Sequence, residues 1–197
     1  MTSGAIRTGM FTGGLCLIAA IAAAQGPGPG GPVGIAAGLQ QQYNFLKNNL
    51  TQAAEVVPES GYAQKVGTMG EVRTYAQVIG HVANAQFGQC SGALGVPNPN
   101  QGNNLEDGTK SRADLIKGLA DSFALCDKAF AALTDQNASE MLSNGRGGQT
   151  ARAVGLLGVI AHGNEMYGIS TVYQRAQNIV PPSTAARGRG RGARGGN

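Results

Sequence analysis

The chain has 197 residues, of which 42% are hydrophobic but only 5% aromatic, and it contains no Trp. Its 15 Lys and Arg outnumber its 11 Asp and Glu, yet Arg7 and four arginines of residues 187–194 lie at the ends, so the middle is near neutral. The length fits one ordinary domain, the aliphatic composition favours an all-α fold over an all-β one, and the charge distribution argues against specific nucleic-acid binding.

The N-terminus has the pattern of a signal peptide. Arg7 precedes an apolar run over residues 9–24, and the three alanines at 22–24 form a cleavage site, so the mature chain is expected to begin near Gln25. The alternative is an N-terminal membrane anchor, but the run is shorter than the roughly 20 residues that span a bilayer. We therefore predict that residues 1–24 are removed, which leaves a periplasmic or secreted protein with no transmembrane segment.

Four helices are predicted after a Gly/Pro-rich linker at residues 25–33. Apolar residues recurring at steps of three and four place them over residues 35–57, 75–94, 111–133 and 149–177. Pro58 ends the first helix, and the pairs Thr74 with Gln77 and Ser111 with Asp114 are capping boxes that begin the second and third. Loops are expected over residues 59–73, 95–110 and 137–148.

The long connection at residues 95–110 determines the expected order of the helices. About 16 residues can extend some 50 Å, enough to return along a helix of roughly 30 Å, so the third helix can run parallel to the second. In the resulting up-down-down-up bundle, Cys90 and Cys126 lie at the same height on neighbouring helices. Loss of Cys16 with the signal peptide leaves these two in an oxidising compartment, which predicts a disulfide between them.

Two histidines are candidates for a polar site. His81 and His162 are the only histidines, and both fall on inward faces of predicted helices. Each could be a core histidine with its hydrogen bonds satisfied, as most lone histidines on such faces are. If the fourth helix runs antiparallel to the second, however, the two come to similar heights, and facing helices of a bundle commonly hold a metal this way.

Residues 75–85 and 161–168 together carry a resemblance to a known family. The chain resembles the DinB-like proteins, four-helix bundles of up-down-down-up topology, over residues 34–180. Members typically hold a divalent metal with one histidine of the second helix and an H-x-x-x-H pair of the fourth. The resemblance therefore implies a zinc or nickel site with His81 and His162 as ligands, and Met166 stands where the third histidine is expected.

Met166 changes what this site is expected to do. A thioether is a soft, weak ligand for zinc or nickel, so the resemblance implies a metal that is weakly held or absent. A site of two histidines and Met166 could take Cu(I), but a Met on an inner helix face is more simply explained by core packing. Gly155, Gly158, Gly163 and Gly168 indicate either a cavity beside His162 or close helix packing.

The resemblance implies two functions of different classes. We favour a non-catalytic binding bundle with a degenerate metal site and an unspecified small-molecule ligand, since a ligand is replaced and export separates the protein from cytoplasmic thiol cofactors. The alternative is a metal-dependent thiol transferase or hydrolase-like enzyme. Residues 181–197 are expected to be a disordered Arg/Gly tail that either contacts anionic polymers or has no role, and homodimerisation stays open.

Overall fold

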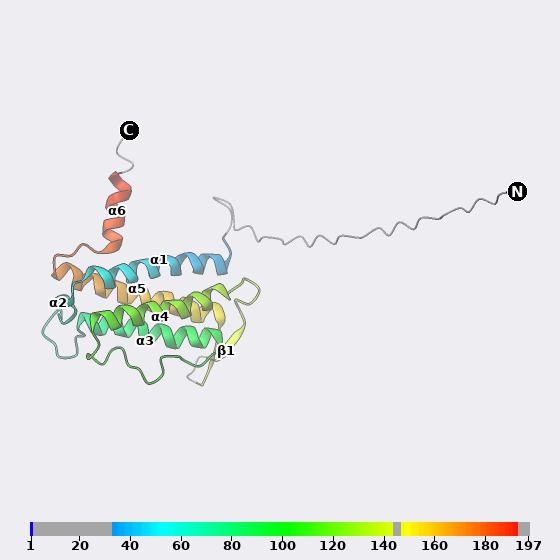
Figure 1. Cartoon of the computed structure of the whole chain (residues 1–197), viewed down its shortest axis with the longest axis horizontal. Coiled ribbons are helices and arrows are strands. Elements are labelled where there is room, and N and C mark those ends of the chain that lie inside the picture. The colour runs from blue at the N-terminus through cyan, green and yellow to red at the C-terminus, as the bar shows by residue number, and fades with distance from the viewer. Residues whose placement is uncertain (2–32, 144–146, 193–197) are drawn as a thin grey trace. The chain divides into compact units, whose positions relative to one another are not determined.

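The computed structural model describes Met1 and residues 33–143 and 147–192. The predicted signal peptide and residues 25–32 of the predicted linker lie outside the described residues. Six helices and two strands follow one another along the described chain (Figure 1): α1 Ile35–Val56, α2 Glu59–Tyr62, α3 Tyr75–Leu94, α4 Arg112–Ala131, β1 Met141–Ser143, β2 Gln149–Ala151, α5 Arg152–Ala176 and α6 Pro182–Gly192. Within these described ranges no helix is both long and apolar enough to cross a bilayer.

The two central helices begin where the sequence predicts. The hydroxyl of Thr74 accepts a hydrogen bond from the backbone N–H of Gln77, and Ser111 does the same for Asp114, each as half of a capping box. These bonds satisfy N–H groups that the first turn of a helix leaves without a partner. At its other end α3 stops at Gly95, whose φ of 68° is left-handed and therefore favours glycine.

Contacts between α3 and α4 show that they run parallel. The Ser122 hydroxyl donates to Gln86 at 2.7 Å, and one turn further along both helices Cys90 and Cys126 form a disulfide with Cα atoms 5.1 Å apart. Both pairs join residues 36 positions apart, so height increases in the same direction on the two helices. This matches the expected pairing of the cysteines.

The other two long helices run the opposite way. Arg152, at the start of α5, donates to the carbonyl of Ala93, at the end of α3. Tyr43, in the first half of α1, donates to Asp127, in the last turns of α4. The prediction of an all-α, up-down-down-up four-helix bundle is therefore confirmed, and Figure 1 shows the four long helices side by side.

The core is aliphatic and aromatic, with a few polar atoms held inside it. Tyr43 stacks on Phe130 with ring centroids 4.0 Å apart, and its hydroxyl reaches Asp127 at 2.7 Å. Tyr75 is fully buried, and its hydroxyl donates to the carbonyl of Ala53 at 2.7 Å. The tyrosine rings thus fill volume between helices while their hydroxyls find hydrogen-bond acceptors on neighbouring segments.

Two segments expected to be irregular contain regular structure. The short helix α2 lies inside the predicted loop 59–73, and β1 and β2 pair as an antiparallel hairpin before α5. Strand β2, Gln149–Ala151, takes the first three residues of the predicted fourth helix, so that helix, α5, begins at Arg152 rather than at residue 149. Its first N–H groups are satisfied from outside the helix, since Arg152 donates to the carbonyl of Glu140 and Ala153 to that of Ala138.

The expectation of a disordered tail from residue 181 also needs correction. Helix α6 covers Pro182–Gly192, while residues 193–197 lie outside the described part of the chain. Pro181 and Pro182 are buried, and the N–H of Ser183 donates to the hydroxyl of Tyr167 at 2.9 Å. Proline suits the first turn of a helix, because it has no N–H to leave unsatisfied.

Candidate functional site

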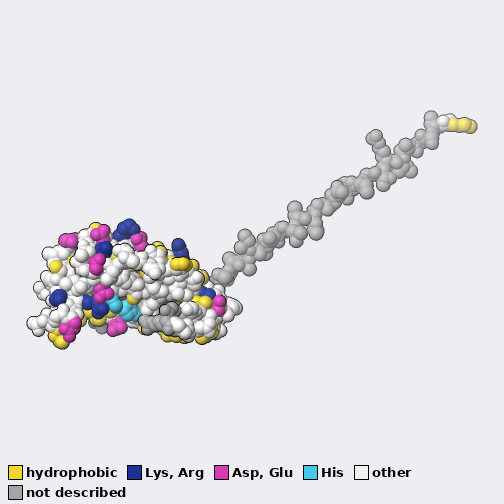
Figure 2. Space-filling view, turned by 90° about the horizontal axis from the view of Figure 1, so that it is seen from below, with side chains coloured by type: hydrophobic (Ala, Val, Ile, Leu, Met, Phe, Trp, Pro, Cys, Tyr) yellow, Lys and Arg dark blue, Asp and Glu magenta, His cyan; other side chains and the backbone are white. Residues whose placement is uncertain are grey.

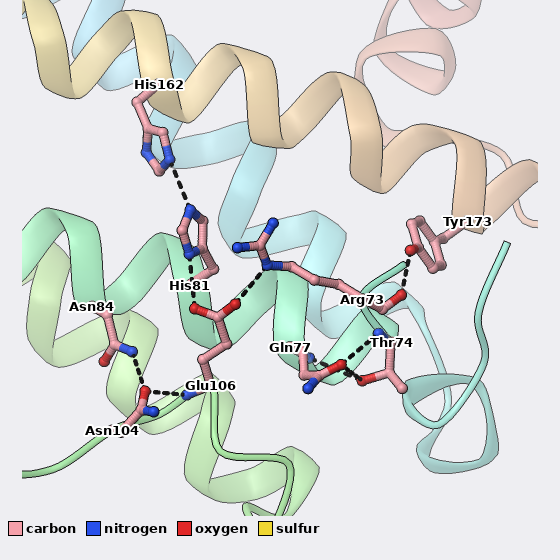
Figure 3. A network of polar contacts seen from close by, with 9 residues as sticks. All are labelled: Arg73, Thr74, Gln77, His81, Asn84, Asn104, Glu106, His162 and Tyr173. Atoms are coloured by element: carbon pink, nitrogen blue, oxygen red, sulfur yellow. Dashed lines mark hydrogen bonds and ion pairs between the residues drawn. The ribbon is translucent and has the colours of Figure 1, made fainter. Parts of the chain in front are cut away.

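The side chains of His81, on α3, and His162, on α5, contact each other. The Nε2 atom of His81 lies 3.2 Å from the Nε2 atom of His162, and the two rings are tilted by 60° (Figure 3). Both side chains are half-buried, and histidine atoms are visible from solvent on the face that Figure 2 shows. The structure therefore brings together the two residues that sequence reasoning paired.

A carboxylate from the long loop holds the far side of His81. One oxygen of Glu106 lies 2.8 Å from His81 Nδ1, and the other accepts from Nε of Arg73 at 2.5 Å (Figure 3). The carbonyl of Arg73 in turn accepts from the hydroxyl of Tyr173, on α5. Sequence reasoning did not find Glu106 or Arg73, and the only available signal was the unusual length of the loop.

Burial and neighbouring groups shift the pKa values of Glu106 and His162. Burial opposes the charged form of Glu106, but hydrogen bonds from Arg73 and His81 outweigh it and lower the pKa of this carboxyl. Burial, with the neighbouring His81 adding to it, lowers the pKa of His162. Histidine binds a metal ion in its neutral form, through the one ring nitrogen that carries no proton.

The loop that carries Glu106 is fixed to the bundle immediately before that residue. Asn84 accepts from the backbone N–H of Leu105 at 3.1 Å and donates to Asn104 at 2.7 Å. Two glycines make room: a Cβ at Gly80 would lie 2.2 Å from the Leu105 carbonyl oxygen, and one at Gly118 would lie 2.7 Å from the Leu105 side chain. Leu105 itself is 5% exposed, so it anchors the loop between α3 and α4.

The residues fit two ligands of a metal site and not a third imidazole. Two nitrogens bound to one tetrahedral zinc ion at about 2.0–2.1 Å lie about 3.3 Å apart, close to the separation of the two Nε2 atoms. Met166 is 3% exposed and belongs to the hydrophobic core. Within the described ranges, no three His, Cys, Asp or Glu side chains are arranged to hold an ion.

A cavity of about 320 Å³ lies between α3, α5 and the hairpin. Gly158 lines it one helical turn from His162, and Gly88 lines it two turns from His81. A Cβ at either glycine would meet no atom within 4 Å, so these glycines leave open space. A Cβ at Gly163 would instead lie 2.5 Å from Leu46, so both the cavity and the close-packing interpretations of the α5 glycines hold, at different positions.

The fold and the site define a class of helical bundle with a polar site between its second and last long helices. The model of the DinB superfamily matches residues 42–166, and the chain belongs to that superfamily. The crystal structure of a DinB-like protein from Bacillus cereus ATCC 10987 has the same fold, with a TM-score of 0.62 and 18% identity. The match covers 74% of this chain and 94% of that one. No curated protein matches the chain significantly.

Proposed function

We propose that this protein is an exported binding bundle that holds a divalent metal ion weakly through His81 and His162. The observation that supports the proposal is the 3.2 Å approach of the two Nε2 atoms, which lets one ion contact both. With Met166 at the third position, such an ion would lack the third imidazole typical of the family. A bound ion would supply Lewis acidity, and open coordination positions would leave room for a small molecule.

Export is the second part of the proposal. The signal-peptide pattern of residues 1–24 supports it, and so does the Cys90–Cys126 disulfide, since disulfides persist in oxidising compartments. We expect N-terminal sequencing of the protein from its native host to begin near Gln25. A chain that retains residues 1–24 in the cytoplasm would contradict it.

The metal proposal is tested by restoring the missing ligand. Residues 162 and 166 are one helical turn apart on one face, so Met166→His should give an ion a third imidazole. Calorimetric titration with Zn²⁺ should show weak binding to the wild type and binding at least about tenfold tighter to the variant, which is 1.4 kcal/mol of binding free energy. The double variant Met166→His with His81→Ala should lose the gain.

Two outcomes would count against this proposal. Submicromolar zinc binding by the wild type would indicate a working metal centre rather than a degenerate one. No gain in Met166→His, if the variant melts like the wild type, would show that the three positions do not converge on one ion.

A metal-dependent enzyme is the second candidate, and the cavity between α3, α5 and the hairpin, one to two helical turns from the histidines, favours it. A volume of about 320 Å³ is at the small end of those that hold organic ligands. Thiol transfer or hydrolysis of a bound small molecule would need both a tightly held ion and turnover. Metal-stimulated turnover by the wild type that is lost in His162→Ala would therefore favour the enzyme over the binding bundle.

A further inference from the structure

The long loop between α3 and α4 carries one ionised carboxylate to the back of the His81 ring. Glu106 approaches Nδ1, the nitrogen that faces away from His162 (Figure 3). An ionised carboxylate can only accept hydrogen bonds, so Nδ1 of His81 must carry the proton of this bond. In the neutral ring, Nε2 is then the unprotonated nitrogen, and it is the one that faces His162.

The arrangement around Glu106 fixes it on both sides. Arg73 binds the second carboxylate oxygen, and the Arg73 backbone is held to α5 through Tyr173. On the other side, the Asn104 side chain accepts from the backbone N–H of Glu106 at 3.0 Å and is itself bonded to Asn84 of α3. The carboxylate therefore reaches His81 from a segment anchored to two helices.

We propose that Glu106 is a positioning residue that selects the His81 tautomer with a free Nε2 facing His162. A histidine that ligates a metal commonly donates its other N–H to a carboxylate, which fixes the ring and makes it a better ligand. The tautomer selection rests on the contacts of Glu106 with His81 and Arg73. Only its use, to present a ligand nitrogen, rests on the proposed function.

Glu106 is not a substitute for the missing third ligand. Its carboxylate bonds Nδ1, on the opposite edge of the ring from Nε2, so it cannot reach an ion held by Nε2 while it keeps that bond. The inference therefore predicts an indirect effect of Glu106 on metal binding, through His81.

The test compares Glu106→Ala with Asp107→Ala in metal-free protein. Asp107 is the next residue of the same loop, but its carboxylate contacts Thr109 and Lys110 rather than the site. Long-range ¹H–¹⁵N spectra report which imidazole nitrogen is protonated. At a pH at which the His81 ring is neutral, we expect the proton on Nδ1 in the wild type and in Asp107→Ala. In Glu106→Ala we expect it to move to Nε2, as in free histidine.

A second measurement separates this inference from the metal proposal. In the Met166→His background, Glu106→Ala should weaken Zn²⁺ binding by about 10- to 100-fold, and Asp107→Ala should leave it unchanged. A His81 tautomer that is the same in wild type and Glu106→Ala would overturn the inference, whatever the metal does. A tautomer change without zinc binding in any variant would sustain it and overturn the proposed metal site instead.

Discussion

Gly80 and Gly88 lie on the same helix and have opposite surroundings. A methyl group at Gly80 would meet the backbone of Leu105, which cannot move without shifting the loop, whereas one at Gly88 would enter open space. We therefore expect Gly80→Ala to destabilise the fold by about 1–3 kcal/mol, as overpacking does. Gly88→Ala should stabilise it by up to about 1 kcal/mol, because alanine favours the helix.

Urea unfolding of the two variants and the wild type checks this pair directly, since each variant is the other's control. The added methyl group in Gly80→Ala should also displace Leu105 and, with it, the neighbouring Glu106. A Gly80→Ala protein as stable as the wild type would mean that the loop does not lie on α3 where the structure places it.

At the residue scale, helical periodicity was enough to predict that His81 and His162 lie at one site, but it gave no indication of Glu106. His81 and His162 lie on inward faces that steps of three and four residues reveal. Glu106 lies in a loop, where no period relates sequence position to direction, so its role depends on anchors such as Asn84 that act across helices. Met166 was ambiguous for the opposite reason, because a core position and a ligand position share the same helical spacing.

The disulfide is the strongest link between two elements. It is fully buried and joins α3 to α4 across a sequence separation of 36 residues. In the chain-entropy model, closing a loop of that length contributes about 4 kcal/mol to the free energy of unfolding. Replacing both cysteines by alanine should therefore lower the melting temperature by roughly 8–16 °C for a domain of this size.

Calorimetry with and without reductant tests the assignment to the disulfide. Reductant should lower the melting temperature of the wild type and leave that of the double alanine variant unchanged. Two free thiols in protein isolated from its native compartment would refute the pairing under physiological conditions.

Elements were predictable where a local signal sets their ends. The capping residues Thr74 and Ser111 begin α3 and α4 as the sequence indicated, since the hydrogen bonds they make lie within four residues. The hairpin before α5 carries no such local signal. Its strands are three residues each, too short for an alternating pattern to stand out from a loop.

At the scale of the whole molecule, one loop length was enough to order the helices. A connection long enough to return along a helix permits parallel neighbours, and the contacts of α3 with α4 confirm them. The structure of the C-terminal end was harder to predict. Its composition suggested disorder from residue 181, whereas a tertiary contact orders the start of α6. Ser183 is held by Tyr167, a residue 16 positions earlier, and no local pattern reveals such a bond.

Two truncations separate the anchored start of α6 from its charged end. Deleting residues 186–197 removes four arginines and keeps the buried Pro181 and Pro182 and the bond of Ser183 to Tyr167. We expect its melting temperature to equal that of the wild type. Deleting residues 181–197 also removes the buried prolines and that hydrogen bond, so we expect a loss of about 1–3 kcal/mol and a melting temperature lower by several degrees.

Heparin chromatography of the same two proteins tests the charge separately from stability. Both truncations remove Arg187 and the three arginines after it, which leaves a domain with 10 basic and 11 acidic side chains once residues 1–24 are also gone. Since polyanion binding follows the number of phosphate- or sulfate-neutralising cations, both should lose salt-dependent retention to the same extent. If deletion of residues 186–197 alone lowered the melting temperature by several degrees, the second half of α6 would have to pack on the bundle. Heparin retention that survives both deletions would place the anion-binding surface on the bundle itself, contrary to its near-neutral charge.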